Sequence, residues 1–87
     1  MSDIYVQFIL DGRTTYADAV YLFYYRFPSV ADKVVRELQD LLIVEDREDL
    51  LVEPEIQEQI IAQAKSDRKK YIEKFNASKQ ATPAVQK

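Results

Sequence analysis

The segment SVADKVVRELQDLL, residues 29–42, decides the fold class, because its apolar residues repeat at the spacing of an α-helix. At 100° per residue, the following side chains fall within an arc of about 140°: Val30, Val34, Val35, Leu38, Leu41 and Leu42. Charged residues occupy the rest of the helix surface. Ser29 is the expected N-cap, with Asp32 at the third helical position. The segment therefore predicts an amphipathic helix that packs on a core.

A helix is also predicted immediately before this one, from about Tyr16 to Phe27. Thr15 is a typical N-cap residue and is followed three positions later by the acid Asp18. Pro28 disfavours a helical conformation for the residue before it and so ends the helix. The two helices are therefore joined by a short turn.

The first apolar segment, residues 4–10, fits two structures. As a strand it alternates apolar and other residues, and Asp11-Gly12 would then be a hairpin turn. As a helix it has Ser2 as N-cap and Gly12 at the left-handed position after the helix. We favour the helix, because the residues after Gly12 start another helix and not a return strand.

The chain after the amphipathic helix is less regular. Residues 43–52 fit either a short β-hairpin around the charged tip 45–49 or a loop with a short helical turn. Pro54 suits the first turn of a last helix that reaches Phe75 or Asn76. We expect one helical domain over residues 1–77 and a disordered tail over residues 78–87, where apolar periodicity is absent.

These elements predict a mainly α fold, a small bundle of three to five helices with the β-hairpin left open. The same order of elements, including the hairpin as a wing, is also that of a winged helix-turn-helix. The charges disfavour that alternative, because Asp32, Glu37 and Asp40 lie on the exposed face of the expected recognition helix. Carboxylates there and at the wing tip would repel DNA phosphates.

The composition argues against an enzyme. The 87-residue chain contains no Cys, no His and a single Gly. Thiolate chemistry, the commonest general base and a glycine-rich phosphate loop are therefore excluded. Nine carboxylates lie between Glu37 and Glu58, but they lack the spacing of a calcium loop. We expect no catalytic residues, no metal site and no cofactor.

Charge is distributed unevenly along the chain. Residues 1–62 carry 5 basic and 13 acidic side chains, a net charge of −8, whereas residues 63–87 carry 7 basic and 2 acidic ones, a net charge of +5. The chain is thus an acidic body with a basic end. Either the two parts contact different partners, or the basic end meets the acidic body in an oligomer.

The segment YLFYYRF, residues 21–27, is the most unusual feature. On a helix it would bury one stripe, while Tyr21, Leu22 and Tyr25 point elsewhere, so the helix is either central in its bundle or has a second face at an interface. In the last helix, Arg68 falls within the apolar stripe of Ile61, Ile72 and Phe75, and Tyr71 is another apolar position of the same helix. An arginine in such a stripe is often found at an interface or a helix end. The predicted protein interface comprises Tyr21, Leu22, Tyr25, Arg68, Tyr71 and Phe75.

Taken together, these features favour a non-enzymatic protein-interaction module, such as a small adaptor, assembly factor or regulator, that associates with itself or another protein. The alternative is a nucleic-acid-binding regulator of the winged helix-turn-helix type, with Lys65, Arg68 and Lys69 as phosphate contacts. No apolar stretch approaches the roughly 20 residues that span a bilayer, and the N-terminus does not resemble a signal peptide. We therefore expect no membrane partner and a cytoplasmic location.

Overall fold

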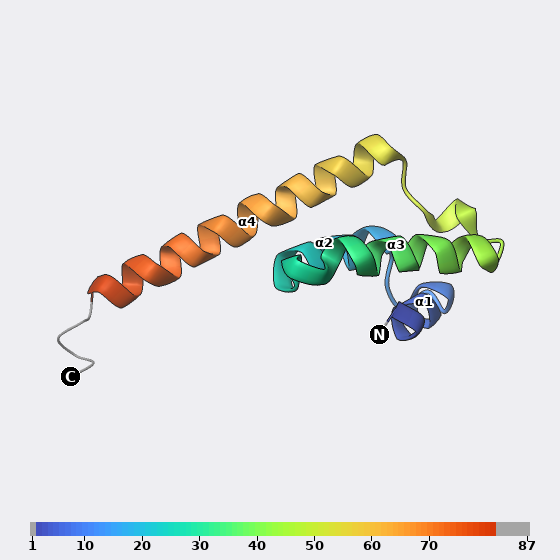
Figure 1. Ribbon diagram of the computed structural model, residues 1–87, viewed down its shortest axis with the longest axis horizontal. Helices are drawn as coiled ribbons and strands as arrows, with labels where there is room; N and C mark the ends of the chain where they lie inside the picture. The colour runs from blue at the N-terminus through green and yellow to red at the C-terminus, as the bar shows by residue number, and fades with distance from the viewer. Residues whose placement is uncertain (1, 82–87) are drawn as a thin grey trace.

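The computed structural model describes residues 2–81 and their side chains as far as Asn76. It contains four α-helices and one turn of 3-10 helix, η1 (Figure 1). Their bounds are α1 (Ser2–Leu10), α2 (Tyr16–Arg26), α3 (Pro28–Val44), η1 (Glu48–Leu50) and α4 (Pro54–Ala81). Residues 2–81 contain no β-strand. The prediction of a mainly α helical bundle is confirmed.

Local hydrogen bonds explain where α1 ends and α2 begins. The amide of Gly12 donates to the carbonyl of Ile9 at 3.1 Å and that of Arg13 donates to Phe8 at 2.8 Å, the two bonds of a Schellman motif. Gly12 has a φ of +78°, which glycine adopts without strain. The Thr15 hydroxyl accepts from the Asp18 amide at 3.1 Å, so the predicted cap of α2 is confirmed.

Two other predicted caps are wrong. Helix α3 begins at Pro28, so Ser29 is already helical, and the N-cap residue Phe27 offers no side-chain bond. Proline needs no hydrogen bond to its nitrogen and has a helical φ, which explains the earlier start. Ser2 is likewise inside α1, and its hydroxyl donates to Glu37 of α3 at 2.6 Å. This bond holds the first turn of α1 against α3.

Residues 43–52 form no hairpin. Helix α3 ends at Val44 with Glu45 as its C-cap, and the next residue, Asp46, has a φ of +60°. The amides of Asp46 and Arg47 donate back to Ile43 and Leu42, each at 2.9 Å, in a second Schellman motif. Leu50, Leu51 and Val52 then pack against the core. Because α3 extends to Val44 and the side chains after η1 pack on the core, residues 43–52 form no pair of strands. These residues therefore supply no wing.

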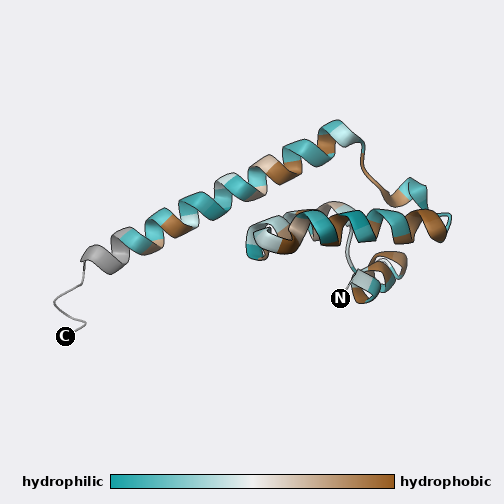
Figure 2. Ribbon diagram, viewed as in Figure 1, coloured by the Kyte–Doolittle hydropathy of each residue, from teal (hydrophilic) through white to brown (hydrophobic). Residues whose placement is uncertain are grey.

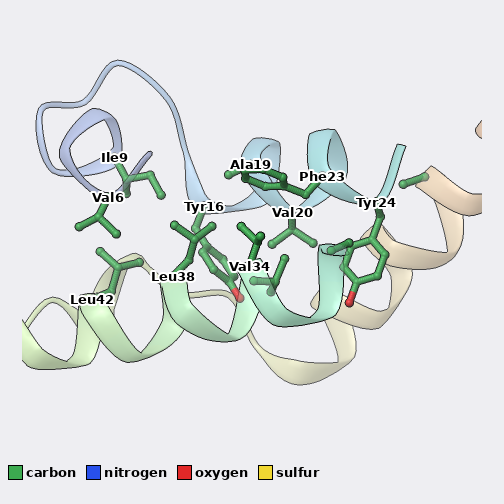
Figure 3. Close-up of a cluster of buried hydrophobic side chains, with 13 residues drawn as sticks. Val6, Ile9, Tyr16, Ala19, Val20, Phe23, Tyr24, Val34, Leu38 and Leu42 are labelled. Atoms are coloured by element: carbon green, nitrogen blue, oxygen red, sulfur yellow. The ribbon is translucent and has the colours of Figure 1, made fainter. Parts of the chain in front are cut away.

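The core lies where α1, α2 and α3 meet (Figure 3). Figure 3 shows Val6 and Ile9 of α1 beside Leu38 and Leu42 of α3, with the side chains of α2 opposite α3. The largest fully buried side chains are Tyr16, Val20, Phe23, Leu38 and Leu42. The predicted stripe of α3 is largely confirmed. Its first member, Val30, is however 44% exposed, and Ala31 is buried in its place.

Helix α4 packs across α2 and then extends past it. Ala64 of α4 is fully buried, and the carboxamide oxygen of Gln57 accepts from the Tyr16 hydroxyl at 2.7 Å and from the Gln39 amide at 3.0 Å. These bonds join α2, α3 and α4. The distal half of α4 projects beyond the other helices (Figure 1). The molecule accordingly measures 57 × 25 × 21 Å, and its radius of gyration is 16.4 Å, against about 12 Å for a compact domain of this length.

Helix α4 as described continues to Ala81, beyond the expected end at Phe75 or Asn76. The start of the predicted tail, residues 78–81, is therefore helical. The rest of that tail, residues 82–87, lies outside the described residues.

Candidate functional site

Helix α2 is covered on two sides within the same chain. One face joins the core, and the other meets α4. On this second face the rings of Tyr21 and Tyr25 stack with centroids 5.8 Å apart and planes at 10°, and Tyr25 also contacts the ring of Tyr71 at 6.3 Å. Two of the tyrosines predicted to point away from the core therefore line the contact between α2 and α4.

Polar bonds fix α4 on this face. The Tyr21 hydroxyl donates to the carboxylate of Asp67, and the Arg68 guanidinium donates to the backbone carbonyl of Tyr25. The bond to the carboxylate raises the pKa of Tyr21, and the same bond, with one from Gln63, lowers the pKa of Asp67. Arg68 thus lies among apolar residues because it satisfies a carbonyl near the end of α2.

The face of α4 that packs on α2 continues beyond the end of α2. At 100° per residue, Tyr71, Ile72 and Phe75 share this face with the buried Ala64. Exposure is 0% at Ala64 but 58%, 41% and 54% at Tyr71, Ile72 and Phe75, respectively. We call these three residues the α4 end surface. A large apolar surface is therefore open where the supporting helix stops.

Basic side chains flank the α4 end surface. Lys69 and Lys74 are exposed on α4 to either side of it, and the Lys65 ammonium lies 5.6 Å from the centre of the Tyr24 ring. An open groove of about 390 Å³ separates this part of α4 from the corner between α2 and α3. Its lining includes Tyr24, Pro28, Lys65 and Ile72. The surface thus has an apolar centre and a mostly basic rim, in which Glu73 is an acidic member.

A second groove lies at the opposite, acidic end of the molecule, between α3 and the start of α4. We call it the acidic groove; its volume is about 470 Å³. Its lining includes Asp40, Ile43, Leu51, Val52, Pro54 and Glu58. Ile43 is 47% exposed, and its neighbour Val44 is 77% exposed. Figure 2 shows hydrophobic residues, in brown, at the C-terminal end of α3 and along the segment that leads into α4.

The structure divides the predicted interface residues. Tyr21, Leu22, Tyr25 and Arg68 are partly buried. Tyr21 and Tyr25 contact α4, and Arg68, which lies on α4, contacts α2. Tyr71 and Phe75 are more than half exposed. Of the predicted nucleic-acid contacts, Arg68 is partly buried and contacts α2, whereas Lys65 and Lys69 are exposed, Lys65 with its ammonium over the Tyr24 ring of α2. The α4 end is therefore the part of the prediction that can meet another molecule.

Sequence reasoning missed the exposure of Ile72 at the α4 end and of Ile43 and Val44 at the acidic end. Helical periodicity assigned Ile72 to an apolar stripe, but periodicity does not indicate where a neighbouring helix ends. Ile43 and Val44 belong to residues 43–52, for which the sequence left open a β-hairpin or a loop with a short helical turn. Their signal was the continuation of apolar residues after the amphipathic repeat, directly before a run of acids.

Over residues 2–76, no group of three or more His, Cys, Asp and Glu side chains could hold a metal ion. Within the same range, every buried side-chain nitrogen or oxygen has a hydrogen-bond partner. No helix in the described part of the chain is both long enough and apolar enough to cross a membrane. The chain matches no family model, no curated protein and no solved structure.

Proposed function

We propose that this chain is a non-enzymatic protein-interaction module that associates with itself through the α4 end surface. The observation that supports the proposal most strongly is the exposure of Tyr71, Ile72 and Phe75 on the face that α2 covers about two turns earlier, at Ala64. Exposed apolar surface of this kind, rimmed by polar residues, is typical of protein-protein contacts. Aromatic residues at the centre and polar residues at the rim match the usual layout of an interface.

Charge favours a second copy of the chain as the partner. The net charge of −8 over residues 1–62 and of +5 over residues 63–87 makes one end of the molecule attract the other end of a neighbouring copy. A small domain also gains more from association than a large one, because it buries a smaller fraction of its own surface. A role as a small adaptor, assembly factor or regulator fits these properties, and the lack of cysteine suits a reducing compartment such as the cytoplasm.

Sedimentation velocity on a surface variant tests the proposal. We expect Tyr71→Gln combined with Ile72→Gln to raise the dissociation constant for self-association at least about tenfold, because apolar anchors at an interface centre dominate binding. Ser66→Gln is the matched control, since it introduces the same side chain on the opposite, exposed face of α4. Helical content should stay unchanged in both variants. Equal self-association of the double variant and the control would show that the α4 end is not the contact.

Nucleic-acid binding is the second candidate, favoured by the exposed lysines of α4. It ranks lower because Lys65 and Arg68 already contact α2, and because residues 43–52 supply no wing. This candidate predicts DNA binding that weakens steeply with salt and is reduced by Lys69→Gln with Lys70→Gln. A chain that shifts in mass only when DNA is present at low salt would reverse the ranking.

A further inference from the structure

We infer that the α4 end surface of one copy docks into the acidic groove of a second copy. This inference rests on the proposed self-association and names the surface that receives it. It differs from a contact in which two α4 ends meet each other. Three properties of the acidic groove and of α4 support it, namely shape, charge and position in the molecule.

The acidic groove can receive large apolar side chains. Its volume of about 470 Å³ lies within the range of about 300–1,000 Å³ of ligand-binding pockets. Ile43, Leu51 and Val52 supply apolar lining, and Ile43 is 47% exposed. The two helices that form the groove are also held together, because the Gln39 amide of α3 donates a hydrogen bond to Gln57 of α4 at 3.0 Å, and both residues line the groove. A preformed groove loses little conformational freedom on binding.

Charge selects the α4 end as the occupant. Asp40 and Glu58 line the groove, and its lining includes no basic side chain. Lys69 and Lys74 are exposed beside the α4 end surface. Docking would therefore place lysines near carboxylates around an apolar centre, whereas pairing of two α4 ends would bring lysines of both copies together. Repulsion between these like charges disfavours the pairing of two α4 ends.

The positions of the two surfaces require two molecules. The acidic groove lies where α4 begins, and the α4 end surface lies on the distal half of the same straight helix (Figure 1). One copy therefore cannot fill its own groove. Two copies side by side in opposite directions can place each α4 end at the groove of the other. Such a closed pair contains two identical contacts and covers the α4 end surface and the acidic groove of both copies.

Mixing two variants tests this arrangement. The groove variant is Ile43→Gln with Glu58→Lys, both at exposed positions, and the end variant is Tyr71→Gln with Ile72→Gln. Ile4→Gln is the control for the loss of an exposed isoleucine, since Ile4 is 57% exposed and does not line the groove. We expect each variant alone to self-associate at least about tenfold more weakly than the unaltered chain. A 1:1 mixture should form a heterodimer, because one intact groove and one intact α4 end remain.

The outcomes separate this inference from the proposed function. A groove variant that self-associates as the unaltered chain does, while the end variant is monomeric, would overturn the groove as partner and leave the role of the α4 end intact. A mixture that stays monomeric would also overturn it. An unaltered chain that stays monomeric at every concentration would contradict both the groove inference and the proposed self-association. High salt should weaken the heterodimer, since the rim charges are exposed.

Discussion

The Arg68 guanidinium of α4 donates a hydrogen bond to the backbone carbonyl of Tyr25, one residue before the end of α2. Carbonyls in the last turn of a helix have no partner within the helix. A cation there also complements the negative end of the helix dipole. Arg68 therefore caps α2 from a neighbouring helix and positions the start of the α4 end surface.

Loss of this cap should destabilise the domain. We expect Arg68→Met to lower the free energy of unfolding by about 1–2 kcal/mol, because a partly buried carbonyl loses a charged donor. Thermal and urea unfolding followed by circular dichroism would measure the change. Lys69→Met is the matched control, since it removes the same charge from an exposed neighbour. Equal stability of the two variants would contradict the capping role.

The bond between Tyr21 and Asp67 should make stability depend on acid pH. The pKa of Asp67 is lowered in the folded chain, so its contribution is complete above the ordinary value of 3.8 and is lost as the pH falls below it. Tyr21→Phe removes the largest cause of this shift. The variant should therefore be less stable at pH 7, and its deficit should shrink toward pH 2. Urea midpoints at several pH values would show this, and a deficit independent of pH would argue against the bond.

Tyr24 should make stability depend on alkaline pH. Burial and then the bond from its hydroxyl to Asp32 raise the pKa of Tyr24 to about 12. The folded chain keeps this proton while the unfolded chain loses it near 10, so stability should fall as the pH rises from 10 to 12. Tyr24→Phe should reduce that slope, although Tyr16 and Tyr21, whose pKa values are also raised, should preserve part of it. Urea midpoints at pH 9, 10 and 11 would measure the slope, and an unchanged one would contradict the assignment.

The core of α3 should tolerate change at one end and not at its centre. Leu38 is fully buried, so Leu38→Ala should cost about 2–5 kcal/mol. Val30 lies on the same apolar arc but is 44% exposed, and Val30→Ala should change stability by less than about 0.5 kcal/mol. Urea denaturation of both variants would compare them. Similar costs at the two positions would mean that Val30 is covered in solution, as in an oligomer.

The sequence predicted the helices well because helix formation follows local rules. The periodicity of α3, the Thr15 cap and the left-handed Gly12 each depend on neighbouring residues alone. The end of α3 was ambiguous, because an aspartate at 46 adopts a positive φ less readily than glycine and so gives a weak signal. Its Schellman motif became visible only in three dimensions.

The candidate site was harder to predict, because exposure depends on where helices end relative to one another. Tyr25 and Tyr71 are both aromatic residues on apolar faces, yet Tyr25 lies against α4, whereas Tyr71 lies at the end of that contact and is 58% exposed. Composition and periodicity treat them alike. The crossing of α4 over α2 separates them, and it is a tertiary property.

Light-scattering mass after size exclusion tests the central claim, self-association, most directly. The unaltered chain, without DNA, should be run at several concentrations and at two salt concentrations. Since the monomer mass is 10.2 kDa, the account predicts a species of about twice that mass or more, formed at high concentration and reduced by salt. A mass of 10.2 kDa at every concentration and both salt conditions would contradict it.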